Sequence, residues 1–285
     1  MIRSILLPLS EGPLAAATRD YAFWLAGKEG SSVNALAVID VKAFEIPVLG
    51  TPDGFMPSVV TPPIAESQSL MTELTTLAKE RLEQFARECD RANIRYSTGT
   101  RTGLPGEIIG RQAVAHDIVV MSRSGYTRAA AAESRVDPLV SEVIRGSIRP
   151  VLVTGMTSPG GGEVRKIVVA FDGSNHAARA LLVAAELGAR PGVECTILTV
   201  SPSQEAAQEI IEPAEAFLYH HGLVPRKQIV SGSRASEVIC EVAAELRADM
   251  LIMGAYGHAP VREMLFGSTT ERVLSHCGTT VVLQS

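Results

Sequence analysis

The sequence predicts an α/β protein with two tandem doubly wound five-stranded parallel sheets, each in the Rossmann-like order 3-2-1-4-5. Three observations support this prediction. Short apolar segments alternate with helix-like segments, the chain repeats its own pattern once, and glycines stand where an apolar segment ends and a helix begins. Strands that alternate with helices favour a parallel sheet, because a parallel crossover is long enough to contain a helix.

The repeat is visible as three pairs of matching segments. They are 2–10 with 165–172, 117–122 with 249–254, and 150–153 with 280–283. The period is far longer than a solenoid unit and therefore indicates duplication of a whole domain. The sequence GMTSPGGG between the copies has the composition of a linker. We expect a first domain at 1–154, a linker at 155–164 and a second domain at 165–285.

Each half supplies five strand-like and four helix-like segments in strict alternation. In the first half we expect strands near 2–8, 33–39, 94–99, 117–121 and 150–154, with helices near 14–28, 66–92, 106–115 and 138–146. In the second half we expect strands near 166–171, 195–200, 227–231, 249–253 and 279–283, with helices near 174–189, 203–221, 235–246 and 268–276. The halves differ at 41–65, a proline-rich insertion after the second strand. It is either a lid or interface flap or a tolerated surface excursion.

Composition excludes several classes of protein. The chain has 285 residues, 46% hydrophobic and 20% charged, so each half has enough apolar residues for a core. The net charge of −5 without a basic patch argues against a nucleic-acid binder. No apolar run reaches membrane-spanning length, and we find no signal-peptide pattern, so we expect a cytoplasmic protein with no membrane partner.

The sequence contains no recognisable catalytic or metal-binding constellation. The four cysteines, Cys89, Cys195, Cys240 and Cys277, are scattered without metal-type spacing, which favours free thiols. The adjacent His220 and His221 would point apart on a helix. There is no GxxxxGK[ST] or GxGxxG motif, and no acid, base and nucleophile stand together. We expect no dedicated catalysis and no protein-held metal.

One motif stands out in the second half: Gly254-x-x-Gly257, nine residues, then Gly267-Ser268-Thr269. It follows the apolar run 250–253 and precedes a helix-like segment. Glycine lets a backbone approach a ligand, and a helix N-terminus offers free N–H groups to phosphate. Simple turn glycines and a Ser268-x-x-Glu271 capping box are the alternatives that need no ligand.

Asp172 occupies the matching place at the end of the first strand of the second half, in Asp172-Gly173-Ser174. In the order 3-2-1-4-5 the chain reverses between strands 1 and 4, and ligands bind outside the carboxyl ends there. Asp172 and Gly254 are therefore expected to converge on one crevice. A carboxylate there can accept hydrogen bonds from an adenine amino group or ribose hydroxyls, although Asp is also a common helix cap.

The first half lacks this chemistry at the matching positions. Ser10 stands for Asp172, Ser122 for Gly254, and Asp137-Pro138 for Gly267-Ser268. An aspartate places its own anion at the helix N-terminus, and proline removes an N–H donor. We expect a self-capped helix and an empty or repurposed site. Arg123, Arg128 and Arg135 in that loop are candidates for another anion, or are simply solvated.

The strand–DGS–helix segment, the glycine motif and the duplication resemble the universal stress protein family over essentially the whole chain. The resemblance implies that ATP binds in the second half only, usually with a divalent metal, Mg²⁺ or Mn²⁺, held by the phosphates. It implies that Asp172 contacts adenine and that Val200 lines the adenine slot. It also implies pairing of the last strands, 151–153 with 281–283, as an intramolecular pseudo-dimer, with a homodimer left open. Ala255 and Tyr256 depart slightly from the family pattern.

The candidate cofactor-binding residues share one place, the carboxyl ends of the strands and the following turns of the second half. They are Ala170, Phe171, Asp172, Val200, Met253, Gly254, Ala255, Gly257, Arg262, Gly267, Ser268, Thr269 and Thr270. The expected function is that of an ATP-binding stress-response regulator with an unknown protein partner. The alternatives are a slow ATPase or ATP-using hydrolase, and a scaffold that binds no nucleotide.

Overall fold

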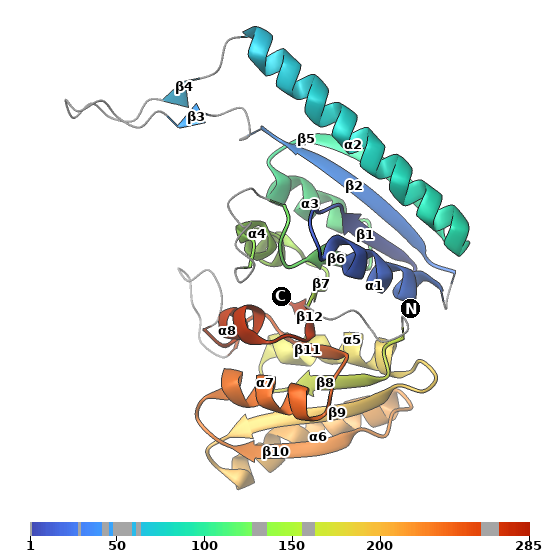
Figure 1. The fold of residues 1–285 in the computed structure, drawn as a ribbon. Helices are drawn as coiled ribbons and strands as arrows, with labels where there is room; N and C mark the ends of the chain where they lie inside the picture. The colour runs from blue at the N-terminus through green and yellow to red at the C-terminus, as the bar shows by residue number, and fades with distance from the viewer. Residues whose placement is uncertain are drawn as a thin grey trace, which may run out of the picture.

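The computed structural model describes residues 2–27, 30–41, 46–47, 59–60, 64–126, 136–155, 163–257 and 268–285. The described part of the first half alternates strands and helices much as predicted (Figure 1). Its elements are β1 (Ser4–Pro8), α1 (Ala15–Gly27), β2 (Ser32–Asp40), α2 (Ile64–Ala92), β5 (Arg95–Gly103), α3 (Pro105–Ala113), β6 (Ile118–Ser122), α4 (Pro138–Gly146) and β7 (Val151–Thr154). The clearest difference in length is β5, which continues four residues beyond the predicted 94–99.

The second half repeats this alternation. Its elements are β8 (Lys166–Ala170), α5 (Asn175–Gly188), β9 (Glu194–Ser201), α6 (Gln204–His220), β10 (Arg226–Ser231), α7 (Ala235–Glu245), β11 (Met250–Gly254), α8 (Ser268–His276) and β12 (Thr280–Gln284). Inside the inserted segment, β3 (Ile46–Pro47) pairs antiparallel with β4 (Val59–Val60). Most of the insertion lies outside the described residues. Both alternatives for it, a lid or interface flap and a tolerated surface excursion, therefore stay predictions.

Ten of the described strands form one sheet that runs through both halves, in the order β10-β9-β8-β11-β12-β7-β6-β1-β2-β5, apart from the β3–β4 pair. Each half has the predicted order 3-2-1-4-5 with parallel pairing. The halves join where β12 meets β7 in antiparallel register, with Val282 opposite Leu152. Because the join is antiparallel, the carboxyl ends of the second half's strands point the same way as the amino ends of the first half's strands.

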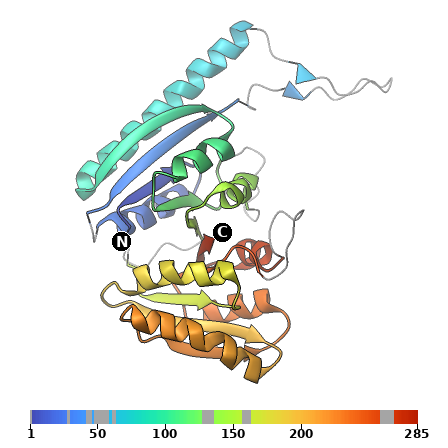
Figure 2. The same cartoon turned by 180° about the vertical axis from the view of Figure 1, so that it is seen from behind.

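Helices cover both faces of this sheet and enclose two hydrophobic cores. One core receives side chains from α1, α2, α5 and α6, and the other receives them from α3, α4, α7 and α8. Strand residues alternate between the two, as Leu152 and Val153 do on β7. Figure 2 shows α5 and α6 in front of the second half, on the face turned away in Figure 1. Both cores cross the β7–β12 join, so the junction is built like a domain interior.

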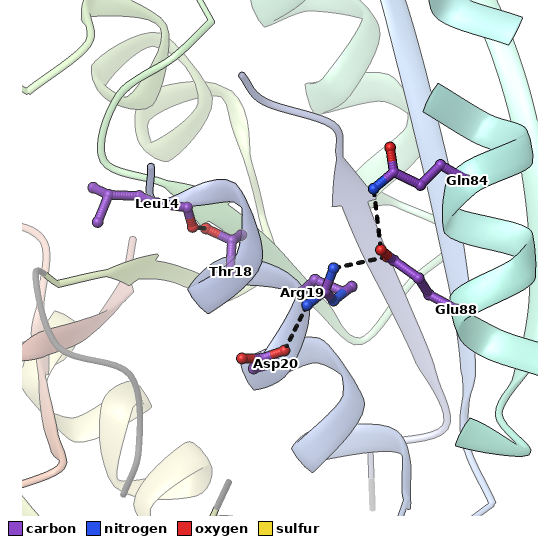
Figure 3. A network of polar contacts seen from close by, with 6 residues as sticks. All are labelled: Leu14, Thr18, Arg19, Asp20, Gln84 and Glu88. Atoms are coloured by element: carbon purple, nitrogen blue, oxygen red, sulfur yellow. Dashed lines mark hydrogen bonds and ion pairs between the residues drawn. The ribbon is translucent and has the colours of Figure 1, made fainter. Parts of the chain in front are cut away.

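Helix α2 lies along the outer edge of the first half, over β2 and β5 (Figure 1). Phe85 is 3% exposed and joins the core beneath it. Figure 3 shows how polar contacts attach the helix to α1: Arg19 Nη1 lies 2.8 Å from Glu88 Oε2, and Gln84 Nε2 donates to Glu88 Oε1 at 3.2 Å. The ion pair is partly shielded from water, so it fixes the position of α2 better than a fully exposed pair would.

The duplication extends to individual hydrogen bonds. Asp117 Oδ2 accepts the backbone N–H groups of Arg3 and Ser4 where β1 begins. Asp249 Oδ2 accepts those of Arg165 and Lys166 where β8 begins. An aspartate that precedes the fourth strand of each half therefore anchors the first strand. These bonds fix the correspondence of Ser4 with Lys166 at the starts of the two strands.

Candidate functional site

The carboxyl ends of β8 and β11 lie side by side, as the predicted topology requires. The two strands pair in parallel from Ile167 with Met250 to Ala170 with Met253. Beyond them, a Cβ built on Gly257 would lie 3.4 Å from Oδ2 of Asp172. The aspartate turn and the first part of the glycine motif, far apart in sequence, therefore meet in one crevice.

The turn after β8 holds the Asp172 carboxylate at the mouth of this crevice. Gly173 has a φ of +80°, a conformation that glycine adopts without steric cost. Asp172 Oδ1 accepts the N–H of Ser174 at 2.9 Å. Ser174 is the N-cap of α5, because its Oγ accepts the N–H of Ala177. Asp172 itself is therefore not the cap, and its side chain is exposed.

Gly254 has a structural reason to be glycine. A Cβ there would lie 2.7 Å from the backbone N of Ala177 and 2.9 Å from Cβ of His176. The first turn of α5 thus packs directly on the end of β11. His176 also meets the ring of Tyr256 edge-on, with centroids 5.3 Å apart. Burial raises the pKa of Tyr256, while the charge of Arg145 on α4 lowers it in part.

Gly257 differs from Gly254. Neither its backbone conformation nor its packing against the described residues requires glycine at this position. Its φ is not among the positive values. The distance of 3.4 Å from its added Cβ to Asp172 is an ordinary contact. Glycine at this position leaves open space beside an exposed carboxylate. This is the arrangement expected where a ligand approaches the backbone closely.

The first turn of α8 forms another wall of the site. Thr270 is 2% exposed, and its hydroxyl donates to the carbonyl of Ala255 at 2.8 Å. The N–H of Ala255 donates to the carbonyl of Gln284. These two candidate residues therefore position the loop, while Ser268 is exposed and Thr269 half-buried. Arg262 and Gly267 lie outside the described residues.

The remaining candidates lie at the floor of the crevice, at the ends of the strands. Ala170, Phe171 and Met253 are each 6–7% exposed at the ends of their strands. Phe171 continues the sheet past β8, because its N–H donates to Leu198 and its carbonyl accepts from Thr199. Val200, near the end of β9, is half-buried. All four lie at the carboxyl ends of neighbouring strands, so they are close enough to share a slot with Asp172.

The corresponding crevice in the first half is filled by the protein's own side chains. Asp137 is fully buried and caps α4; one carboxylate oxygen accepts from Leu139 N and the other from Tyr126 N. The Tyr126 hydroxyl accepts from Ser122 N at 2.8 Å and donates to Pro8 O at 3.3 Å. Burial raises the pKa of Tyr126 well above its ordinary value. The predicted self-capped helix is present, and a tyrosine bridges the crevice mouth.

Backbone packing closes the same crevice further. Gly125 has a φ of +96°, and its carbonyl accepts the N–H of Glu11 at 2.8 Å. A Cβ on Gly125 would collide with the carbonyl of Glu11. Arg123, considered above as an anion ligand, is 7% exposed and donates from Nη2 to the carbonyl of Cys277. It is therefore a contact between the halves; Arg128 and Arg135 lie outside the described residues.

Metal-binding clusters and membrane-spanning helices are both absent from the described residues. They contain no group of three or more His, Cys, Asp or Glu side chains placed to hold a metal ion. No helix in the same described ranges is long and apolar enough to cross a membrane. His221 Nδ1 contacts the carbonyl of Phe217 within its own helix. The crevice of the second half therefore remains the candidate site.

Comparison with known proteins agrees with this geometry. Residues 163–283 match the model of the universal stress protein family. The second half of the chain is therefore similar to members of that family. A universal stress protein of Synechocystis sp. is 26% identical over 96% of this chain and 96% of its own length, so the likeness includes the first half.

Solved universal stress proteins share the fold of both halves. A universal stress protein from Archaeoglobus fulgidus has a TM-score of 0.76 at 21% identity, covering 99% of this chain and 96% of that one. A putative universal stress protein from Pseudomonas aeruginosa has a TM-score of 0.63 at 18% identity, covering 99% and 93%. These identities are low enough that the likeness concerns the fold alone.

Sequence reasoning assigned no role to three residues of these crevices: His176 and Tyr256 in the second, and Tyr126 in the first. The signal for Tyr126 was its place directly after Gly125 in the loop that matches the glycine motif. A tyrosine there is large enough to reach the end of β1. His176 and Tyr256 gave no comparable signal, because their contact depends on how α5 packs over β11.

Proposed function

We propose that this protein acts as a universal stress protein that binds ATP in the crevice of its second half only, as an ATP-responsive regulator. The observation that carries the proposal is Gly257, whose missing side chain leaves space beside the exposed carboxylate of Asp172. A carboxylate at this position suits the amino group of adenine or the hydroxyls of ribose. The apolar strand ends, with Val200 among them, suit the flat face of the base.

The chemistry of the α8 end supports phosphate as the second part of the ligand. Ser268 and Thr269 place two hydroxyls on the first turn of a helix whose N–H groups favour an anion. Gly267 precedes them in the sequence. The described residues hold no carboxylate or histidine cluster that would bind a metal by itself. A divalent ion, Mg²⁺ or Mn²⁺, would therefore be held mainly by the phosphates.

ATP bound there would influence the contact between the halves. Tyr256 lies in the crevice loop, and the charge of Arg145 on α4 of the first half partly lowers the pKa of Tyr256. Ala255 in the same loop is hydrogen-bonded to Gln284 at the end of β12, the strand that joins the halves. Occupancy of the crevice can thus alter the junction, and through it a surface presented to a partner protein.

The test is calorimetric titration of nucleotide-stripped protein with ATP and Mg²⁺, followed by a phosphate-release assay on the same sample. We expect one site per chain and negligible turnover. The variant Asp172→Ala/Gly267→Val should abolish binding while the chain stays folded by circular dichroism. Ser10→Ala, the matching position in the first half, should bind ATP normally.

Each other outcome would point to one of the alternatives. Normal ATP affinity in the folded double variant would remove the assigned site. Rapid phosphate release by the wild-type protein would favour an ATPase or ATP-using hydrolase. Absence of binding by the wild-type protein would favour a scaffold whose glycine motif serves only packing.

A further inference from the structure

The four cysteines of the chain differ in their surroundings, because two thiols are isolated and two are neighbours. Cys89 and Cys195 lie buried in the core beneath α1, α2, α5 and α6. Burial raises the pKa of each of these thiols to about 12, so both are held in the unreactive protonated form. Cys240 and Cys277 belong to the core on the other face, and their thiols interact with each other. Both are free thiols in the structure.

The packing of α7 against α8 brings this pair together (Figure 1). Cys240 lies in the middle of α7 and is half-buried. Cys277 directly follows α8, and its N–H donates to the carbonyl of Val273 at 2.9 Å. Cys277 is 3% exposed, but its neighbours His276 and Gly278 are exposed. The two thiols therefore lie just beneath the surface, where a molecule little larger than water can reach them beside the half-buried Cys240.

A buried guanidinium lies beside the pair. Arg123, directly after β6, donates from Nη2 to the carbonyl of Cys277 at 2.6 Å. Its Nε is buried and has no hydrogen-bond partner among the described residues. A positive charge at this place favours a thiolate over a thiol. The charge comes from the first half and both cysteines from the second, so the surroundings of the thiols are complete only across the junction.

The two thiols of the pair differ in acidity. The interaction with Cys240 is the largest cause that lowers the pKa of Cys277, and burial opposes it in part. Hydrogen bonds from the N–H and hydroxyl of Thr279, and the charge of Arg123, lower the pKa further. The interaction with Cys277, together with burial, raises the pKa of Cys240. Because the thiolate is the nucleophile, Cys277 is the attacking sulfur and Cys240 is the resolving one.

The turn that begins at Cys277 is held in place by the first half. A Cβ on Gly155, at the end of β7, would collide with the carbonyl of Gly278. The N–H of Gly155 donates to Oγ1 of Thr280 at 3.0 Å. A bond between Cys240 and Cys277 would therefore tie α7 to a fixed turn at the junction. It would also close a covalent loop that contains β11 and α8.

We propose that Cys240 and Cys277 are an oxidation site, which forms a reversible disulfide when hydrogen peroxide reaches it. The Cys277 thiolate attacks one peroxide oxygen. An S–O bond forms, the O–O bond breaks, and the departing hydroxide takes up the proton that the thiol released, giving water.

The second step closes the disulfide. The Cys240 sulfur attacks the sulfur of the Cys277 sulfenic acid. The S–S bond forms, the S–O bond breaks, and the hydroxyl group leaves with the Cys240 proton as a second water. The two thiols together lose two electrons, which reduce one peroxide to two water molecules. No nucleotide takes part, so this site is independent of the proposed ATP site.

The test treats the fully reduced full-length chain, without nucleotide, with one equivalent of hydrogen peroxide at pH 7. Free thiols are then counted in denaturant, and the disulfide is located by peptide mass spectrometry. We expect the loss of two of the four thiols and an intramolecular product lighter by two hydrogen atoms. The cross-link should join the peptides that contain Cys240 and Cys277. Dithiothreitol should restore all four thiols.

Serine variants separate the roles of the two sulfurs. Cys277→Ser should leave Cys240 reduced, because its thiol is the less acidic of the two. Cys240→Ser should stop at a sulfenic acid on Cys277, which dimedone traps as a stable adduct. Cys195→Ser, which removes a buried thiol from the other core, is the matched control and should form the same cross-link as the wild type. Asp172→Ala should form it too, because the step does not use the ATP site.

Three results would overturn the proposal. They are four free thiols in the wild type after treatment, a cross-link that contains Cys89 or Cys195, and an unchanged loss of two thiols in folded Cys277→Ser.

Discussion

The two crevices occupy equivalent places in the two halves, but one presents an open carboxylate and the other is filled. In the second half, Asp172 is exposed beside Gly257. In the first half, the buried carboxylate of Asp137 accepts a hydrogen bond from the N–H of Leu139 at the start of α4. The Tyr126 hydroxyl bridges β1 and β6. The comparison teaches that one scaffold can satisfy a helix N-terminus either with its own carboxylate or with an external anion.

The largest expected effect concerns the two glycines of the open crevice. Gly254→Ala should lower the free energy of unfolding by about 2–3 kcal/mol, because the new methyl group meets the backbone of α5 in an overpacked contact. Gly257→Ala should cost less than about 1 kcal/mol, since its Cβ makes only ordinary contact. Urea denaturation of both variants measures the difference. Equal stability losses would mean that Gly257 too is a packing residue.

A second effect tests whether the filled crevice can be opened. Asp137→Gly/Pro138→Ser should lower the free energy of unfolding by about 1–2 kcal/mol, because the N–H groups of Leu139 and Tyr126 lose their acceptor. ATP binding measured by calorimetry should remain at one site per chain, since Ser10 and Ser122 still replace the aspartate and the glycine. A stoichiometry that rises toward two would show that the cap alone blocks the first crevice.

A third effect concerns the tyrosine that bridges the filled crevice. Tyr126→Phe should cost about 1–2 kcal/mol of stability at neutral pH, because the N–H of Ser122 loses its acceptor. Tyr219→Phe, at a 67% exposed position, is the control and should be neutral. Urea denaturation at pH 7 measures both; an unchanged midpoint for Tyr126→Phe would argue that water replaces the hydroxyl.

The same tyrosine predicts a dependence on alkaline pH. Burial raises the pKa of Tyr126, and it raises the pKa of Tyr21 to about 12. A raised pKa in the folded state means that the folded chain holds these protons more tightly. The stabilisation is thus complete below about pH 10, the ordinary tyrosine pKa, and is lost as pH rises toward 12. Denaturation between pH 9 and 12 should show a smaller loss in Tyr126→Phe than in the wild type.

The smallest expected effect is at the cap of α5. Ser174→Ala should lower stability by about 1 kcal/mol, because the N–H of Ala177 loses its acceptor beside the open crevice. Ser203→Ala, which removes the equivalent bond to Ala206 on the more exposed α6, is the matched control. Thermal denaturation should show the larger loss for Ser174→Ala, since Ser174 is 5% exposed. A larger loss for Ser203→Ala would contradict the view that α5 is held tightly against β11.

Much of this architecture could be predicted from the chain because its signals are local. Apolar runs such as 250–253 end at glycines or aspartates, and the strand boundaries differ from prediction by a few residues at most. The order 3-2-1-4-5 follows from the alternation of strands and helices, and it brings Asp172 to Gly257. The roles within the motif were not predictable in the same way. Gly254 serves packing because of where α5 lies, and Thr270 is buried by the loop it supports.

Contacts between side chains of distant segments could not be predicted from local sequence patterns either. Cys240 and Cys277 show no motif spacing, yet their thiols interact in the folded chain, and this interaction lowers the pKa of Cys277. The contact of Arg123 with Cys277 and the contact of Arg190 with Trp24 also join segments from opposite halves. Such contacts depend on the antiparallel join of β7 and β12.

The sequence by itself determined the strand and helix pattern, the duplication and the contrast between the two crevices. These are properties of periodicity and of single residues such as Asp172 and Asp137, which act through their own backbone surroundings. Only the tertiary structure decided that Tyr126 bridges one crevice, and that the thiols of Cys240 and Cys277 meet beside Arg123 at the junction. The reason is physical: burial, closure and cavities depend on volumes that several distant segments fill together.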